Sequence, residues 1–273
     1  MNYRHAFHAG NFADCMKHAL LLWLLRAMQR KEAGFLTLDT HAGIGRYDLS
    51  GDEAQRTGEW QGGIGRLQVG TTDPALADYL GIVETLGLYP GSPAIVAEVL
   101  RPQDRLICCE LHPEDFLACR HNFRDDRQVA VHLRDGYEAM GAFLPPKEKR
   151  GLILIDPPYE RGDEFSRLTE ALHQAHRKFP SGVYAAWYPI KHRAPVRAFH
   201  QAVADAKIRD VVAGELLLRE PVEPDRLNGC GLLVVNPPWK FDEEAGPILA
   251  ALAARLTTRE AGAGSQVTRI VAE

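Results

Sequence analysis

Short apolar runs that alternate with helix-like stretches constrain the fold of this chain more than any other feature. Five such runs, rich in β-branched or aliphatic residues, lie at 35–40, 105–111, 129–135, 151–158 and 182–189. Alternation of strands with helices is typical of a parallel sheet. Two further runs, 211–218 and 231–238, flank a segment rich in Pro, Asp, Asn and Gly. They predict an antiparallel pair that closes the sheet.

The length and composition exclude several classes of protein. A chain of 273 residues can form one large domain with an insert or two domains. Its longest apolar run, Ala19 to Leu25, has seven residues, and the amino terminus lacks the features of a signal peptide. We therefore expect no membrane segment and a cytoplasmic location. The five cysteines form no CxxC pair, which indicates free thiols, and the net charge of −4 requires that any nucleic acid be bound by local patches.

The spacing of two strand-end acids predicts an insertion. Asp39 and Glu110 are 71 residues apart, whereas a nucleotide-binding βαβ unit separates such groups by about 20. We divide the chain into a main domain, 1–46 and 91–273, and an inserted helical subdomain, 47–90. The subdomain is expected to stand over the carboxyl ends of the strands.

Capping residues predict three helices around this insertion. Asn11 is expected to cap a helix that runs to about Lys31, with Gly34 as the stop signal. The other two are expected from Asp73 to Gly87 and from Ser92 to about Leu100. The tail after Thr258 shows no clear period.

The sharpest chemical signal is Asp156-Pro157-Pro158-Tyr159, directly after an apolar strand. Ligands bind at the carboxyl ends of strands in doubly wound folds. The prolines withhold N–H groups and leave carbonyls free to accept, and Tyr159 supplies a flat face. An acid, carbonyl acceptors and an aromatic ring together suit an exocyclic amine, so the motif indicates an amine methyltransferase. A rigid Pro-Pro turn is the alternative.

A glycine turn follows the first strand in the stretch from Asp39 to Tyr47. Gly43 and Gly45 permit close approach of the backbone to a nucleoside ligand. Position 48 is Asp rather than the glycine of a dinucleotide motif, and no phosphate-binding P-loop occurs. An ordinary glycine turn is the alternative reading.

Two more acids end strands. Glu110 can accept hydrogen bonds from both ribose hydroxyls, and Asp135 can accept from an adenine amino group while Gly136 leaves room for the ring. Each acid alone is better explained as a helix cap or a solvated residue. Together with Asp156 they predict a cofactor site.

Three other patterns could also indicate a functional site. Asn236-Pro237-Pro238-Trp239 repeats the amine-methyltransferase pattern, but an antiparallel last strand would place Asn236 on the opposite edge from Asp156. The histidines at 5, 8, 18 and 41 match no common metal spacing, so we expect no metal. The acid-free stretch from Tyr188 to His200 is either a solvated face or a phosphate contact.

The whole set of motifs resembles the RlmJ family of 23S ribosomal RNA adenine-N6 methyltransferases. The likeness spans nearly the whole chain and includes YRHAFHAGNFADCMKH, LDTHAGIGRY, YPGSP, ELHP, DG, LILIDPPYE and the late NPPW. The resemblance implies a class I S-adenosylmethionine-dependent methyltransferase with a Rossmann-like seven-stranded sheet and an inserted small helical subdomain.

The resemblance also implies site residues. Cofactor contacts would fall on His18, His41, Ser92, Glu110, Asp135, Gly136 and Asp156, and Tyr3 would contact the RNA. From charge and placement we add Lys17 for the methionine carboxylate of the cofactor. For the RNA we add Arg4, Lys191 and Arg193.

These observations predict an enzyme that methylates N6 of an adenine in 23S ribosomal RNA, either protein-free or in an early assembly intermediate. The base is expected to be unstacked against Tyr159, with its amino group facing Asp156 and the Pro157 carbonyl. Either Asp156 or water takes the released proton. The rivals are a DNA adenine-N6 methyltransferase and a noncatalytic RNA-binding module on the same fold.

Overall fold

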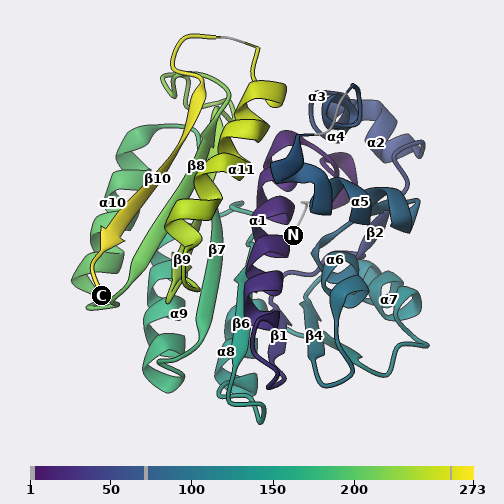
Figure 1. The fold of residues 1–273 in the computed structure, drawn as a ribbon, viewed down its shortest axis with the longest axis vertical. Coiled ribbons are helices and arrows are strands. Elements are labelled where there is room, and N and C mark those ends of the chain that lie inside the picture. Colours follow the sequence, from purple (N-terminus) through teal and green to yellow (C-terminus); the bar gives the residue numbers. More distant parts are fainter. Residues whose placement is uncertain (1–3, 71–72, 259) are drawn as a thin grey trace.

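A large mixed sheet forms the centre of the computed structural model, which describes residues 4–70, 73–258 and 260–273 (Figure 1). Within these residues the sheet has eight strands in the order β10-β8-β9-β7-β6-β1-β4-β5. The strands are β1 (Leu36–Asp39), β4 (Arg105–Glu110), β5 (Val129–Leu133), β6 (Gly151–Ile155), β7 (Val183–Ile190), β8 (Val211–Leu217), β9 (Gly229–Val235) and β10 (Gly264–Val271). Five neighbouring strands of this sheet, β7, β6, β1, β4 and β5, are parallel. This confirms the predicted parallel sheet.

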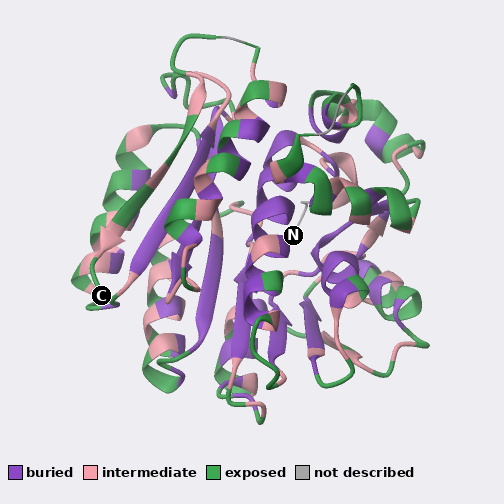
Figure 2. Cartoon of the chain, viewed as in Figure 1, coloured by how far each residue is buried: buried purple, intermediate pink, exposed green. Residues whose placement is uncertain are grey.

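Helices cover both faces of the sheet. One face carries α1 (Phe12–Gln29), α6 (Ser92–Val99), α7 (Pro113–Asn122) and α11 (Phe241–Leu256). The other carries α8 (Gly136–Phe143), α9 (Glu164–Lys178) and α10 (Arg193–Asp205). Strand β6 is buried on both sides: Leu152 and Leu154 join one apolar cluster, and Ile153 and Ile155 join the other (Figure 2). Two-sided burial explains why these strands are continuous apolar runs.

Helix α1 starts as predicted and ends slightly early. The Asn11 side chain accepts from the N–H groups of Ala13 and Asp14, which is an N-cap. The helix ends at Gln29, before the expected Lys31. Gly34 does not cap it: a Cβ there would lie 2.4 Å from the Gln103 carbonyl, so close packing against the next loop requires the glycine.

Short helices fill the segment between β2 (Arg46–Tyr47) and β3 (Tyr89–Pro90), which pair antiparallel. They are α2 (Asp52–Thr57), α3 (Glu59–Gly62), α4 (Ile64–Leu67), the 3-10 turn η2 (Pro74–Leu76) and α5 (Ala77–Leu86); a further turn, η1 (His5–Phe7), precedes α1. Asp73 caps this stretch and Gly87 ends it, as predicted. Helix α6 begins at Ser92, but its N-cap is Gly91.

The carboxyl-terminal part corrects one expectation. Strands β8 and β9 pair antiparallel as predicted, but they do not close the sheet, because β10 pairs with β8 outside them. The expected seven strands are therefore joined by an eighth. Most side chains of this edge strand are half-buried or exposed, so backbone hydrogen bonds hold it and no apolar period marks it. None of the described helices is long and apolar enough to cross a membrane.

Candidate active site

A cavity of about 910 Å³ opens at the carboxyl ends of the parallel strands, where doubly wound folds bind ligands. Most residues predicted from the sequence lie on its wall. They are Lys17, His18, His41, Gly43, Ser92, Glu110, Asp135, Gly136, Asp156, Pro157, Tyr159 and Lys191. The structure thus brings together segments that are far apart in the chain.

The Asp156-Pro157-Pro158-Tyr159 segment follows β6 directly and lies at the cavity wall. Tyr159 has a left-handed backbone, with φ of 50°. Its hydroxyl donates to the Trp187 carbonyl at 2.9 Å, and its ring meets Phe165 and Trp187 edge-on. These contacts fix the turn that presents Asp156 to the cavity.

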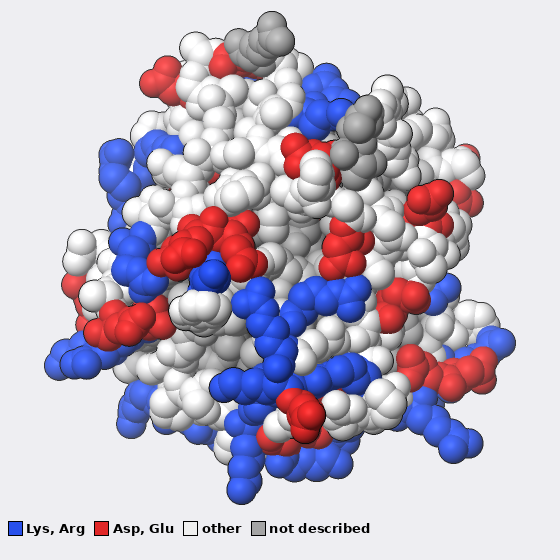
Figure 3. All heavy atoms as spheres, in the orientation of Figure 1, with Lys and Arg blue, Asp and Glu red and all other residues white. Residues whose placement is uncertain are grey.

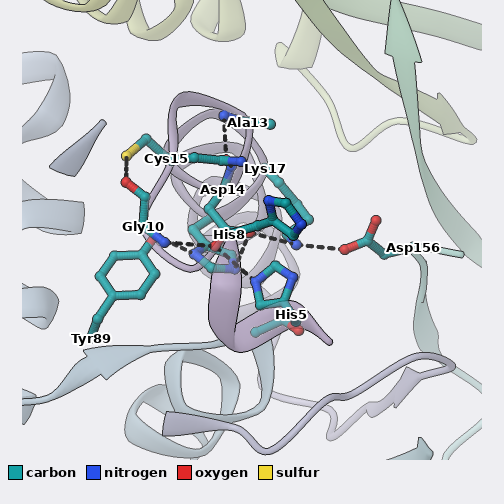
Figure 4. Close-up of polar contacts among 12 residues, drawn as sticks. His5, His8, Gly10, Ala13, Asp14, Cys15, Lys17, Tyr89 and Asp156 are labelled. Atoms are coloured by element: carbon teal, nitrogen blue, oxygen red, sulfur yellow. Dashed lines mark hydrogen bonds and ion pairs between the residues drawn. The ribbon is translucent and has the colours of Figure 1, made fainter. Parts of the chain in front are cut away.

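An ionic cluster reaches Asp156 from α1 (Figure 4). The Lys17 ammonium lies 2.5 Å from Asp156 Oδ2 and 3.0 Å from Asp14 Oδ1. Asp14 Oδ2 in turn contacts His5 Nε2 at 2.9 Å and accepts from the Gly10 N–H. Burial disfavours the Lys17 charge, but the two carboxylates hold its pKa well above the ordinary value. Lys17 therefore holds Asp156 in place, and its expected contact with the methionine carboxylate of the cofactor stays a prediction.

His18, which follows Lys17 in α1, is fully buried. Its Nδ1 lies 3.1 Å from the Tyr89 hydroxyl, which in turn lies 3.1 Å from the Tyr79 hydroxyl. Its Nε2 has no hydrogen-bond partner among the described residues. Burial, with a contribution from Lys17, lowers the pKa of His18 to about 3, so the ring is neutral.

The turn after β1 is tied to the end of β4. Gly43 has φ of +59°, and a Cβ there would lie 2.3 Å from the Tyr47 hydroxyl, so only glycine fits. Its N–H donates to Glu110 Oε2 at 2.9 Å, and the His112 N–H donates to Oε1 at 2.7 Å. Burial raises the pKa of Glu110. The backbone thereby orients a carboxylate that keeps lone pairs for a ligand.

Asp39, the last residue of β1, lies beside this turn and was not predicted as a site residue. It is fully buried, accepts from the Ser92 hydroxyl at 2.6 Å and accepts from the His41 N–H at 3.3 Å. Burial raises its pKa to about 6. Ser92 thus directs its hydroxyl to Asp39. Burial also lowers the pKa of His41 to about 4, and its Nδ1 lies 2.8 Å from the Thr40 hydroxyl.

Asp135 and Gly136 begin α8 at the cavity. Asp135 Oδ1 accepts from the N–H groups of Tyr137 and Glu138, so the helix-cap reading of this acid applies. A Cβ on Gly136 would lie 2.3 Å from the Thr40 carbonyl and 2.8 Å from the His41 ring. The glycine therefore lets α8 approach the β1 turn.

The residues predicted to contact RNA are dispersed. Tyr3 lies outside the described residues. Arg4 pairs with Glu114 and Asp115 at 2.9 and 3.3 Å. The exposed Lys191 lines the cavity, whereas Arg193 lies 2.5 Å from the buried Glu215.

Asn236 lies on the opposite edge of the sheet, as the antiparallel direction of β9 predicts. Its amide donates to the carbonyls of Pro180 and Gly182 at 2.8 and 2.7 Å. Those residues precede β7, whereas the cavity lies beyond its other end. The second Pro-Pro motif therefore has a structural role.

Several cavity residues were missed from the sequence. Asp14 was detectable, because it stands three positions before Lys17 on an otherwise apolar helix. The buried Glu164 accepts from Tyr137 at 2.8 Å, and Arg167 lies over the Tyr137 ring at 4.8 Å. No local pattern marks this group, since α8 and α9 come together only in the folded chain. No group of three His, Cys, Asp or Glu suited to a metal occurs among the residues with described placement.

Known proteins are similar to this chain over nearly its whole length. The family model described as "Ribosomal RNA large subunit methyltransferase D, RlmJ" matches residues 32–270. The "Ribosomal RNA large subunit methyltransferase J" of Haemophilus influenzae is 40% identical over 270 residues, and that of Escherichia coli K12 is 37% identical over 269; each match covers 96% of both chains. The crystal structure of protein LPL1258 from Legionella pneumophila is 33% identical, with a TM-score of 0.88 over 96% of this chain and 98% of that one.

Proposed function

Because this chain belongs to the RlmJ family of ribosomal RNA large subunit methyltransferases, we propose that it methylates the N6 amino group of an adenine in 23S ribosomal RNA, with S-adenosylmethionine as the donor. The chain has the class I methyltransferase fold, with a large, mostly parallel sheet. The observation that carries the proposal is the placement of Asp156, which is held by Lys17 at the wall of the cavity and followed by Pro157 and Tyr159.

The residues around the cavity suit S-adenosylmethionine. Glu110 offers an oriented carboxylate for the ribose hydroxyls, and Asp135 retains one oxygen beyond its helix cap for the adenine amino group. Gly136 keeps the adjoining space free of a side chain, and the buried Nε2 of His18 still needs a partner. We also assign His41, Gly43 and Ser92 to this site. The sulfonium of the cofactor supplies an electrophilic methyl group.

Asp156 is proposed to orient the target amine. Its Oδ2 is bound by Lys17, and no described residue donates to Oδ1. The free oxygen and the Pro157 carbonyl can each accept one N–H of the amine, while Tyr159 offers its ring to the base. Hydrogen bonds to both N–H groups turn the nitrogen lone pair toward the methyl group, and they strengthen as charge develops on the nitrogen.

The ionic cluster bears on the fate of the proton. The Lys17 ammonium already occupies Oδ2 of Asp156. Oδ1 is the oxygen left to accept from the amine, so we propose that the amine proton is released to water after transfer. Asp156 would then act as an acceptor that positions the amine.

The RNA contacts remain predictions. Lys191 is well placed, because it is exposed and lines the cavity. Arg193 and Arg4 would have to share their guanidinium groups with the acids that hold them. Arg219 also lines the cavity, but it is paired with Glu260 and would have to share its guanidinium group in the same way. Action on ribosomal RNA also fits the cytoplasmic location expected from the sequence.

Methyl incorporation distinguishes this function from its rivals. Protein-free 23S ribosomal RNA, assembled large subunits and duplex DNA are each incubated with the protein and radiolabelled S-adenosylmethionine, followed by nucleoside analysis. We expect N6-methyladenosine in the protein-free RNA. Methylation of DNA alone would identify a DNA enzyme. Binding of RNA without incorporation in any substrate would identify a noncatalytic module.

A further inference from the structure

The edge of the sheet opposite the cavity is strongly basic, although the chain as a whole carries a net charge of −4. This basic edge consists of the connections that enter the parallel strands and β8, together with the one that leaves β9. They hold eleven Lys and Arg against six Asp and Glu, and Glu273, which follows β10 at the same edge, adds a seventh acid. The connections are 30–35, 100–104, 123–128, 144–150, 179–182, 206–210 and 236–240.

Hydrogen bonds join these connections into one surface. Arg101 donates to the carbonyls of Lys31 and Ala33, and Arg150 donates to the carbonyls of Met28 and Ala33. On the other side of α1, Arg30 donates to the Trp239 carbonyl. Figure 3 shows basic side chains gathered over the lower part of the molecule, where these loops lie in Figure 1.

The acids of the basic edge do not neutralise its lysines. Glu148 pairs with Arg105 of β4, and Asp210 pairs with Arg269 of β10. No acid lies within 4 Å of Lys31, Lys147 or Lys149 among the described residues. Burial, and to a lesser extent the neighbouring charge of Arg101, lower the pKa of Arg150.

Three lysines of this edge have left-handed backbones. The φ angles are 58° at Lys149, 59° at Lys207 and 70° at Lys240. Glycine or asparagine adopts this conformation at lower cost, and other residues lose about 1 kcal/mol or more there. Asp210 and Asn236 in the same connections also have φ of 50°, so the left-handed turns of this edge carry three cations and one acid.

We propose that the basic edge binds the phosphate backbone of ribosomal RNA at a distance from the methylated nucleotide. This inference rests on the proposed function, because it takes ribosomal RNA as the ligand. Three arginines of this edge, Arg30, Arg101 and Arg124, are paired with acids. Its lysines have no acidic partner among the described residues, and closely spaced cations of this kind are what a polyphosphate chain requires. Such a surface does not distinguish between RNA sequences. It increases the affinity for the RNA and fixes its orientation on the protein.

The separation of the two edges defines the RNA that can use both. Strands of five or six residues span roughly 17–20 Å, and the connections add to this length. A single nucleotide or a very short strand cannot touch both edges. A large folded ribosomal RNA can place its target adenine in the cavity while a flanking segment passes along the helices to the basic edge.

The test uses a fourfold variant, Lys31→Gln, Lys147→Gln, Lys149→Gln and Lys240→Gln, in the full chain. Its matched control carries Arg at the same four positions. Arginine keeps the positive charge, and like glutamine it must adopt the left-handed backbone at positions 149 and 240. Binding of protein-free 23S ribosomal RNA is measured across a salt series, and binding of S-adenosylmethionine serves as the folding control. Each lost phosphate contact lowers the salt slope by roughly 0.7–0.9.

We expect the Gln variant to bind RNA at least tenfold more weakly at about 0.1 M salt, with a salt slope lower by roughly two to four. The Arg variant should bind as the wild type does, and both should bind S-adenosylmethionine normally. If the RNA-binding curves of the Gln variant and the wild type coincide, the inference is wrong. This holds even if an acidic protein is then found to bind the edge. Wild-type protein that binds RNA through this edge but never methylates it would contradict the proposed function alone.

Discussion

The two oxygens of Asp156 have different surroundings, and this difference matters at the scale of single residues. Oδ2 lies 2.5 Å from the buried Lys17, which also contacts Asp14. Removing one partner of a buried ion pair commonly destabilises a protein by about 3–5 kcal/mol. Asp14 remains in an Asp156 variant, so Lys17 keeps one partner. The acid thus contributes to stability as well as to chemistry.

Asp156→Ala should nevertheless fold and lose turnover. The variant lacks an acceptor whose interaction with the amine grows in the transition state, which commonly costs a hundredfold or more in rate, about 3 kcal/mol. Asn236→Ala is the control, because it removes two hydrogen bonds of the other Pro-Pro motif and should leave the rate nearly intact. Single-turnover methylation at saturating cofactor, run below the melting temperature of both variants, decides between them. A normal rate for Asp156→Ala, or a collapsed rate for well-folded Asn236→Ala, would reverse the assignment.

Glu110→Gln should weaken cofactor binding. A glutamine has one oxygen, so it cannot accept from both backbone N–H groups and also from the ribose. Hydrogen bonds to charged groups contribute about 1.5–3 kcal/mol, which corresponds to a loss of affinity of roughly tenfold to a hundredfold. Calorimetric titration with S-adenosylmethionine measures it. Glu114→Gln, at an exposed acid outside the cavity, is the control, and equal affinities for both variants would remove Glu110 from the ribose site.

At the scale of elements, the start of α8 is fitted closely to the turn after β1. Gly136→Ala would place a methyl group 2.3 Å from the Thr40 carbonyl. Overpacking of this kind typically costs about 1–3 kcal/mol. The displaced helix should also loosen the cofactor site, because Asp135 caps the same turn.

Gly141→Ala in the same helix is the matched control. A Cβ at Gly141 meets nothing within 4 Å, and alanine in a helix interior is more stable than glycine by about 0.5–1 kcal/mol. We expect the melting temperature to fall in Gly136→Ala and to stay or rise in Gly141→Ala. A fall of similar size in both would mean that α8 is sensitive to any substitution.

The elements also show which parts of the fold can be read from the sequence. The runs ending at Asp39, Glu110 and Asp156 were recognisable because burial on both faces requires continuous apolar residues. Strand β10 was missed, since an exposed edge strand has no such demand. The acids at strand ends were found because parallel strands bring their carboxyl ends to one edge. The contact between Lys17 and Asp156 joins residues 139 positions apart, and no local pattern encodes it.

At the scale of the whole molecule, buried histidines make stability depend on pH. The pKa of His18 is about 3 in the folded chain, below its ordinary value of 6.5. Between these values the unfolded chain binds a proton that the folded chain does not. The stabilisation is therefore complete above about pH 6.5 and is lost as the pH falls toward 3, by up to about 1.4 kcal/mol per pH unit.

His18→Gln should reduce this dependence. Glutamine can still form a hydrogen bond with Tyr89 but takes up no proton. The free energy of unfolding is measured in urea at pH 7, 6 and 5, where His41 contributes equally to both proteins. We expect a shallower decline for the variant by up to about 1.4 kcal/mol per pH unit. Parallel declines would show that His18 is already charged in the folded state.

The position of β10 has a consequence for biosynthesis. This strand covers the outer edge of β8, yet it is made after every other strand of the sheet. While the chain is still being translated, β8 presents unpaired N–H and carbonyl groups, to which another nascent chain can add a strand. We therefore expect chaperones to be needed until β10 has covered this edge. Chains that stop near residue 258 would carry all the cavity residues but would be prone to self-association through the uncovered β8.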